Sequence, residues 1–122
     1  MTDHDRLIDR YIAGWNEADA ARRTLLVAEA FAPDATYLDP LMRGEGHAGI
    51  AAMIGAAQAQ FPGHRFRRRG PADAHNGHLR FAWDLAPEGN LPIAAGTDFV
   101  ELAPDGRLAR VTGFLDAVER EA

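Results

Sequence analysis

The spacing of apolar residues changes from a helical to an alternating period at Pro62-Gly63. Before this dipeptide, apolar residues recur at the three- and four-residue spacing of helices that bury one face. Between Leu79 and Leu85 they occupy every second position, which is typical of a strand with one buried face. Helices first and strands second predict an α+β protein, with the helices on one face of an antiparallel sheet.

Three helices are predicted before Pro62. Asp19 is the expected N-cap of the second helix, Ala20 to Phe31, which Ala32-Pro33-Asp34 should end. A loop from Gly44 to Gly49 should lead into the third. The apolar stripes are Leu7, Ile8, Tyr11, Ile12 and Trp15 in the first helix; Leu25, Leu26, Ala30 and Phe31 in the second; and Ile50, Met53, Ile54, Ala57 and Phe61 in the third.

A short strand over 35–39 and four long strands, at about 64–75, 78–87, 91–103 and 107–117, are predicted. Asn76-Gly77 is a strong signal for a tight hairpin, and Glu88-Gly89-Asn90 and Asp105-Gly106 indicate two further turns. Three helices on such a curved, mostly antiparallel sheet of four to five strands should form a cone whose open end is a small-molecule pocket. We find no repeat or linker, so residues 1–122 are expected to form a single domain.

Composition excludes several classes of chemistry. The 13 basic residues are all arginine and the 18 acidic residues leave a net charge of −5, which argues against nucleic acid or an anionic membrane as partner. The absence of lysine excludes Schiff-base catalysis, and the absence of cysteine excludes disulfides and thiolate chemistry. We see no signal peptide and no run of about 20 apolar residues, so a cytoplasmic protein is expected.

Asp39 is the most unusual residue of the predicted short strand. It shares a face with Tyr37 in an otherwise apolar segment, and an acid on a half-buried strand is costly unless something compensates. One compensation is a catalytic role, because a carboxyl in such surroundings can have a tuned affinity for protons. The alternative is structural: Asp39 could cap the following turn or pair with Arg43.

Several segments resemble the nuclear transport factor 2-like superfamily, and within it the SnoaL-like polyketide cyclases and ketosteroid isomerases. They are Tyr11-Ile12-Ala13-Gly14-Trp15-Asn16, Phe31-Ala32-Pro33-Asp34-Ala35-Thr36-Tyr37-Leu38-Asp39-Pro40 and Gly46-His47-Ala48-Gly49-Ile50. The resemblance implies a cystatin-like α+β barrel and a reaction without cofactor or metal. It also implies Asp39 as general base, with Tyr11 and a protonated Asp98 as donors to the enolate oxygen.

The resemblance implies further pocket residues. Trp15, Tyr37, His47, Trp83 and Phe114 are expected to contact substrate. For Trp15, Trp83 and Phe114 the alternative is a core role, for Tyr11 a satisfied core hydroxyl, and for His47 a loop cap. Asp98 could instead be a structural acceptor for Tyr11. The chain has two tryptophans and only two tyrosines. We therefore expect a pocket too narrow for a steroid.

The predicted function is acid–base catalysis, an isomerisation or an aldol-type cyclisation, on a small apolar carbonyl compound. The rival is a binding or interaction domain that holds an apolar molecule without turnover.

A homodimer is expected through the sheet face that carries Arg80 and Asp84. His75 and His78 lack a third ligand nearby, and the basic run His64 to Arg69 should be divided between two faces of a strand. An epoxide hydrolase would need an Arg-x-Asp motif where Arg80-Phe81-Ala82 stands.

Overall fold

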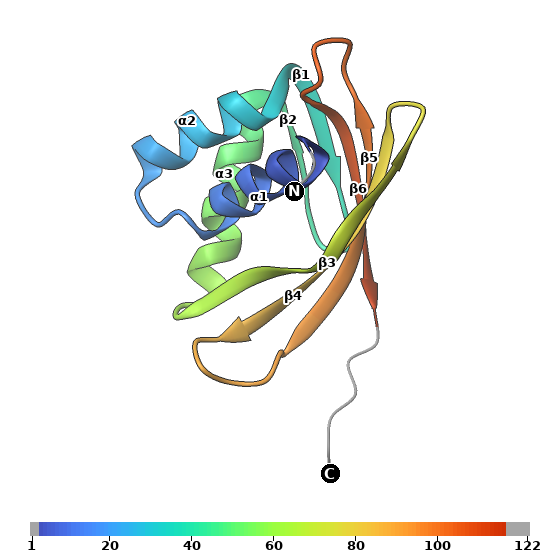
Figure 1. Ribbon diagram of the computed structural model, residues 1–122. Helices are drawn as coiled ribbons and strands as arrows, with labels where there is room; N and C mark the ends of the chain where they lie inside the picture. Colours follow the sequence, from blue (N-terminus) through green and yellow to red (C-terminus); the bar gives the residue numbers. More distant parts are fainter. Residues whose placement is uncertain (1–2, 117–122) are drawn as a thin grey trace.

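The protein is described from a computed structural model, in which residues 3–116 are placed well enough to describe. Three helices lie on one side of a curved sheet (Figure 1). The elements are α1 (Asp3–Asn16), α2 (Ala20–Ala30), β1 (Phe31–Leu38), β2 (Arg43–Glu45), α3 (Gly46–Gln60), β3 (His64–His75), β4 (His78–Pro87), β5 (Ala94–Leu102) and β6 (Leu108–Asp116).

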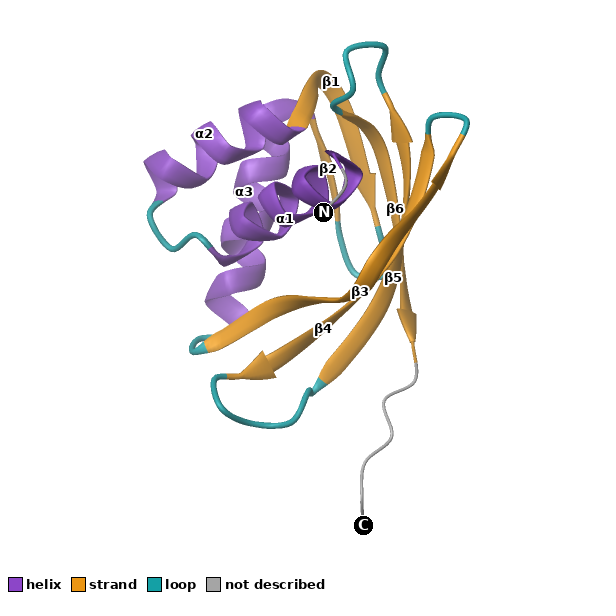
Figure 2. Cartoon of the chain, viewed as in Figure 1, coloured by secondary structure: helices purple, strands orange, loops and turns teal. Residues whose placement is uncertain are grey.

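Within residues 3–116 the sheet has six strands, in the order β2-β1-β6-β5-β4-β3. Neighbouring strands are antiparallel except β1 and β6, which run parallel. The sheet curves around the helices without closing, because β2 and β3 remain its two edges (Figure 2). The α+β class and the curved, mostly antiparallel sheet are confirmed, whereas residues 3–116 form six strands rather than the expected four to five, and the sheet does not close into a barrel.

The helix α1 is amphipathic, as predicted, and α1 and α3 each bury one face on the sheet, whereas α2 packs mainly on α1 and α3. On α1, Ile8, Tyr11 and Trp15 are buried, and on α3 Ile50 and Ile54 are. The side chain of Asp19 accepts a hydrogen bond from the backbone N–H of Arg22, which confirms the predicted N-cap of α2. In α2 the prediction for Leu25 was wrong: its side chain is 65% exposed, and Val27 is buried in its place.

Several boundaries differ from the prediction. The strand β1 begins at Phe31, so Pro33 lies inside it rather than in a turn after α2. The register between β1 and β6 shifts between Phe31 and Thr36, and such an irregularity tolerates a proline that has no N–H to donate. The expected loop 44–49 instead contributes to β2 and the first turn of α3, and β5 starts only at Ala94, beyond Pro92.

Turn chemistry explains the long hairpin of β3 and β4. Asn76 and Gly77 both have positive φ angles, of 49° and 76°, as a tight two-residue turn between twisted strands requires. The β3–β4 register also shifts between Arg69 and Asp73, around Gly70 with a φ of 77°. Such bulges bend a strand and increase its twist, and this one contributes to the curvature that makes the sheet concave.

The basic run is divided between the two faces of β3, as predicted. The guanidinium of Arg67 pairs with Asp84 on the outer face, whereas that of Arg68 pairs with Asp5 and Asp9 of α1. These arginines therefore have structural partners within the chain. No helix among residues 3–116 has both the length and the hydropathy needed to cross a membrane.

Candidate active site

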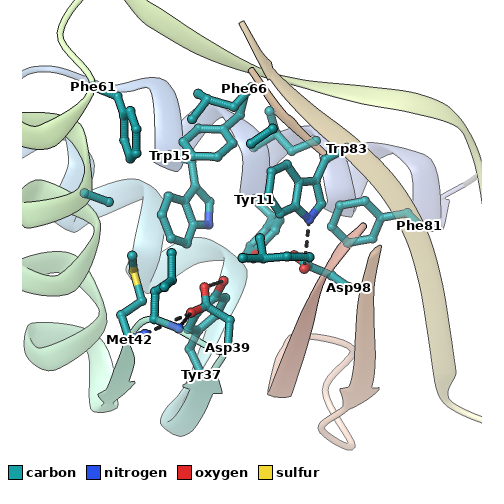
Figure 3. Close-up of a pocket in the computed structure, with 16 residues that line it drawn as sticks. Tyr11, Trp15, Tyr37, Asp39, Met42, Phe61, Phe66, Phe81, Trp83 and Asp98 are labelled. Atoms are coloured by element: carbon teal, nitrogen blue, oxygen red, sulfur yellow. Dashed lines mark hydrogen bonds between the residues drawn. The ribbon is translucent and has the colours of Figure 1, made fainter. Parts of the chain in front are cut away.

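A cavity lies between the helices and the concave face of the sheet (Figure 3). Its volume is about 120 Å³, comparable to the engineered cavity of ~150 Å³ that binds benzene. The lining residues come from every layer of the fold: Tyr11, Ile12, Trp15, Tyr37, Asp39, Leu41, Met42, Ala57, Phe61, Phe66, Phe81, Trp83, Leu85, Ala94, Asp98 and Leu115. Leu41 and Leu115 are 71% and 46% exposed, which places them at the entrance.

The structure brings together most of the residues that the sequence proposed for a site. Those that line the cavity are Tyr11, Trp15, Tyr37, Asp39, Trp83 and Asp98. Among all the lining residues, only Asp39 and Asp98 have side chains that carry a formal charge. The cavity is therefore apolar, with two acids and no base to neutralise them.

His47 and Phe114, which were predicted to contact substrate, do not line this cavity. The Nε2 atom of His47 lies 2.7 Å from the backbone oxygen of Phe31, so the ring holds the start of α3 against β1. Phe114 is 52% exposed and contacts Phe99 edge-to-face on the outer side of the sheet. Its neighbour Gly113 is the buried, inward-facing position of β6 at this level.

Asp98 on β5 is an acceptor on both of its carboxyl oxygens. The phenol of Tyr11 donates to Oδ2 at 2.8 Å, and the indole Nε1–H of Trp83 donates to Oδ1 at 3.0 Å. Only 2% of Asp98 is exposed. Burial raises the pKa of this carboxyl to about 6, while the two hydrogen bonds lower it and the charge of Asp39 raises it.

Asp39 also borders the cavity, immediately after β1, and it has a structural task. Its Oδ2 accepts a hydrogen bond of 2.6 Å from the hydroxyl of Tyr37. Its Oδ1 accepts from the backbone N–H groups of Leu41 and Met42, at 2.8 and 2.9 Å. The alternative interpretation of Asp39 as the cap of the following turn is therefore confirmed, whereas Arg43 is not its partner.

The two tyrosines act as hydrogen-bond donors in this network. Burial raises the pKa of the Tyr11 phenol well above its ordinary value, and the charge of Asp98 adds to the shift. Burial likewise raises the pKa of Tyr37. Both phenols are therefore protonated at neutral pH, and each gives its single hydrogen to a carboxyl oxygen, to Asp98 from Tyr11 and to Asp39 from Tyr37.

Gly113 makes the approach of the two acids possible, and sequence reasoning did not single it out. It lies on β6 opposite Asp98 of β5, and Asp39 follows directly after Leu38, which pairs with Thr112. A Cβ atom at Gly113 would lie 2.9 Å from Oδ1 of Asp98 and 3.2 Å from Cβ of Asp39. A glycine inside a strand pattern is the available signal for such a close approach.

Gly96 has a comparable role beside Trp83, its partner across the β4–β5 pair. A Cβ atom at Gly96 would overlap the indole ring of Trp83 and approach the backbone oxygen of Phe114 to 2.5 Å. The missing side chain lets the indole lie against the strand, with its N–H directed at Asp98. This glycine is therefore part of the support for the acid.

Trp15 carries a buried polar group without a partner. The ring is 6% exposed and packs on Tyr37 and Phe66, with centroids 5.5 and 5.1 Å away. Its buried Nε1–H has no acceptor in good hydrogen-bond geometry, and its nearest interaction is with the Tyr11 hydroxyl, where it lowers the pKa of that phenol. An unpaired buried donor costs about 1–3 kcal/mol, so it is uncommon in a native fold.

Fold and cavity together define a small cystatin-like α+β protein with an acid-bearing apolar pocket. The chain belongs to the SnoaL-like domain family, whose model matches residues 8–111, and the resemblance seen in the sequence is confirmed. Its sequence is 49% identical to that of a candidate isomerase of the SnoaL-like family from Agrobacterium tumefaciens str. C58, which has a crystal structure. The two structures match with a TM-score of 0.90, and the match covers 96% of this chain and 100% of the other.

More distant structures share the fold alone. A candidate polyketide cyclase from Sinorhizobium meliloti is 21% identical with a TM-score of 0.67, covering 88% of this chain and 93% of its own. A protein of unknown function with a cystatin-like fold from Methylobium petroleophilum PM1 is 23% identical with a TM-score of 0.72, covering 95% of this chain and 77% of the other. No curated protein matches the chain.

Proposed function

We propose that this protein is a cofactor-independent acid–base enzyme that moves a proton next to the carbonyl group of a small, neutral, apolar compound. The observation that carries the proposal is the carboxyl of Asp98, which faces the apolar cavity, is nearly inaccessible to bulk solvent and accepts hydrogen bonds from two neutral donors. The candidate isomerase and cyclase among the similar structures agree with this class of reaction.

Asp98 is the better candidate for the base. The resemblance gave that role to Asp39 and made Asp98 and Tyr11 donors to the substrate oxygen. The contacts favour another division, because Tyr11 donates to Asp98, and an acid that accepts on both oxygens is bonded as a carboxylate. A pKa of about 6 leaves this carboxylate ionised at neutral pH and more basic than an ordinary aspartate.

One carboxylate, that of Asp98, is sufficient for the proposed proton transfer. A lone pair of the Asp98 carboxylate takes the proton from the carbon next to the carbonyl, and the electrons of the C–H bond move to the carbonyl oxygen as an enolate. Returning the proton to a different carbon gives an isomer, whereas attack of the enolate carbon on a second carbonyl closes a ring and leaves an alkoxide, which takes the proton back from Asp98. Asp39 and Tyr37 support the cavity at its entrance loop.

A binding protein without catalysis is the second candidate. It is favoured by the hydrogen bonds of Asp39, whose two oxygens serve the loop and Tyr37 rather than a free cavity. The fold does not by itself imply catalysis, because a de novo designed protein with a curved β-sheet has a similar fold. It matches this chain with a TM-score of 0.69 at 13% sequence identity. In this case the same cavity would hold a neutral molecule unchanged.

Exchange of substrate protons with D₂O tests the proposal, because it detects enolisation before isomerisation and cyclisation diverge. We expect wild-type protein to accelerate exchange at the α-carbon of small ketones such as 3-cyclohexenone, followed by NMR. Asp98→Asn should lower the rate about 10²–10⁴-fold, the usual contribution of a general base. Asp39→Asn, the matched control, should retain most of the activity if the loop stays in place.

The outcomes separate the two candidates. Equal exchange rates for wild type and Asp98→Asn would exclude Asp98 as the base. Loss in Asp39→Asn with retention in Asp98→Asn would return the role to Asp39. Ketone binding without any exchange by the wild type would support the binding protein.

We also propose that the outer face of the sheet meets a second copy of the chain. Phe99 and Phe114 are 45% and 52% exposed there and contact each other at 5.6 Å between ring centroids. Ion pairs flank them, Arg80 with Asp73 and Arg110 with Glu101. An apolar centre with balanced charges around it suits an isologous contact, in which the same patch serves both partners.

A further inference from the structure

A second recess lies where the end of α1, the start of α2 and the last turns of α3 meet (Figure 1). Its volume is about 410 Å³, within the range of small-molecule sites. The residues that line both the recess and the apolar cavity are Trp15, Ala57, Phe61, Phe66 and Leu85. The two spaces therefore share an apolar wall.

The recess and the cavity differ in charge. The cavity is lined by two acids, Asp39 and Asp98. The recess is lined by no aspartate or glutamate, and the side chains there that can carry a positive charge are Arg23 and His64. An anion that the cavity would repel is therefore favoured in the recess.

The guanidinium of Arg23 is held in place by neighbouring groups. Its Nη1 donates to the backbone oxygen of Glu17 at 3.0 Å and to Oε1 of Gln58 at 2.7 Å. The amide of Gln58 is fixed in turn, because its Nε2 donates to the backbone oxygens of Trp15 and Glu17. A donor that is already ordered loses little further conformational freedom when it binds a ligand.

The rest of this guanidinium has no partner within residues 3–116. Nη1 uses both of its hydrogens, whereas Nε and Nη2 donate to nothing there. The other half-buried arginines of this range have carboxylate partners, Arg68 with Asp5 and Arg107 with Asp105. A half-buried cation without an anionic partner is only partly compensated for its lost hydration, so a bound anion would stabilise Arg23.

The helix α3 has a glycine where the guanidinium lies. The three atoms nearest to a Cβ built at Gly55 all belong to the Arg23 side chain, with Nη2 at 3.0 Å. Glycine in the middle of a helix is destabilising relative to alanine, so a glycine here is unfavourable for α3 alone. Both residues line the recess, so the Nη2 edge of the guanidinium lies beside it.

We propose that this recess binds a small organic carboxylate, whose two oxygens accept from Nε and Nη2 of Arg23 while its apolar body lies on the shared wall. A planar guanidinium edge matches the two oxygens of a carboxylate. A phosphate would leave further oxygens against the apolar wall without donors, so it fits less well. This site is separate from the proposed base and exists whether or not the cavity is catalytic.

Benzoate, with neutral benzamide of similar shape as control, tests the site by NMR on ¹⁵N-labelled protein. We expect benzoate to move the Arg23 Nε–H signal, identified by its absence from Arg23→Gln, and the amide signal of Gly55. The indole signal of Trp83, which lines the cavity but not the recess, should stay in place. Benzamide should bind at least about tenfold more weakly, because it lacks the charge that strengthens the hydrogen bonds.

Two variants measure the contribution of the guanidinium. Arg23→Gln should weaken benzoate binding at least about tenfold. Arg22→Gln removes the same charge from the adjacent residue, whose side chain is 76% exposed and pairs with Glu17, and should keep the affinity of wild type. Gly55→Ala should also weaken binding, by displacing the guanidinium, without lowering stability in urea unfolding. If Arg23→Gln does not fold, Gly55→Ala decides the question.

Saturable benzoate binding that depends on Arg23 or Gly55 would support the site, whatever the result of the proton-exchange experiment. A shift of the Trp83 signal with unchanged affinity in Arg23→Gln or Gly55→Ala would place benzoate in the apolar cavity and overturn the proposal. Equal affinity for benzamide would show that charge has no part in binding and would also overturn it. Binding of inorganic phosphate but not benzoate, or of neither, would contradict a carboxylate site.

Discussion

The phenol of Tyr11 on α1 donates a hydrogen bond of 2.8 Å to the carboxyl of Asp98 on β5, a residue 87 positions further along the chain. This bond crosses the interior from the helical layer to a central strand, and both residues are buried. It makes Asp98 an acceptor and uses the single hydrogen of Tyr11. The distribution of roles in the site follows from this contact.

Asp98 should make stability depend on pH in the acidic range. Burial raises its pKa from 3.8 to about 6, so the folded chain binds this proton more tightly than the unfolded chain does. The contribution of Asp98 to the free energy of unfolding is therefore greatest below about pH 4. This contribution is lost as pH rises to about 6, and the total loss is roughly 3 kcal/mol at most. Urea unfolding between pH 4 and 7 measures it.

Asp98→Asn should flatten this dependence, because the amide does not titrate. Asp34→Asn, which changes an exposed carboxyl on β1, serves as the control and should leave the slope of wild type. An equal slope for Asp98→Asn and wild type would show that Asp98 does not carry a raised pKa.

Gly113→Ala should disturb both acids at once. The added methyl group would lie 2.9 Å from Oδ1 of Asp98 and close to Asp39, so the strand or the carboxyls must shift. We expect a loss of about 1–3 kcal/mol in the free energy of unfolding, together with a fall in proton exchange. Gly49→Ala on α3 is the matched control, because a Cβ there meets nothing within 4 Å. Equal stability of the two variants would contradict the close approach.

Gly96→Ala should act on Asp98 indirectly, by displacing the indole of Trp83. Loss of the Trp83 hydrogen bond removes an interaction that lowers the pKa of Asp98, so this pKa should rise further above 6. The pH profile of proton exchange, or ¹³C NMR titration of the carboxyl, would report the shift. Trp83→Phe removes the same N–H and should move the pKa in the same direction; a shift toward lower pH in either variant would oppose this account.

Phe114→Glu should dissociate the proposed dimer. The new carboxylates would meet in the apolar centre of the outer face, where the flanking arginines, Arg80 and Arg110, already pair with Asp73 and Glu101. Sedimentation velocity should then give a dimer for wild type and a monomer for Phe114→Glu. Leu91→Glu changes another exposed apolar residue, 82% accessible and in the loop before β5, and should remain dimeric. A monomeric wild type would contradict the assembly.

Much of the fold could be predicted because its signals are local. The apolar stripe of α1, the cap at Asp19 and the turn at Asn76-Gly77 each depend on residues close in sequence. The pairing of β1 with β6 could not be predicted in this way, because it joins segments more than 70 residues apart and depends on packing. The short strand β2 exists only as a partner of β1 and has no periodic signal of its own.

The residues of the site were partly predictable from local sequence signals, but their contacts were not. Asp39 stood out as an acid in an apolar segment and the family resemblance pointed to Asp98, and both line the cavity. That Asp98 accepts from Tyr11 and that Asp39 caps the following turn were both alternatives from the sequence, but only the three-dimensional contacts decide between them and the catalytic roles. Phe114 was expected in the pocket, but the inward position on β6 at this level is Gly113. A glycine has no apolar side chain, so the alternating pattern did not reveal that it faces inward.

The place of β6 between β1 and β5 has a consequence for how the protein is made. Asp39 and Asp98 flank Gly113 of β6, so they become neighbours only when this last described strand inserts between its two partners. During vectorial synthesis, the helices and the β3–β5 meander leave the ribosome before the pocket exists. A nascent chain in which β6 has not yet paired therefore lacks the complete pocket, so a ligand of this pocket would stabilise only chains in which β6 is in place.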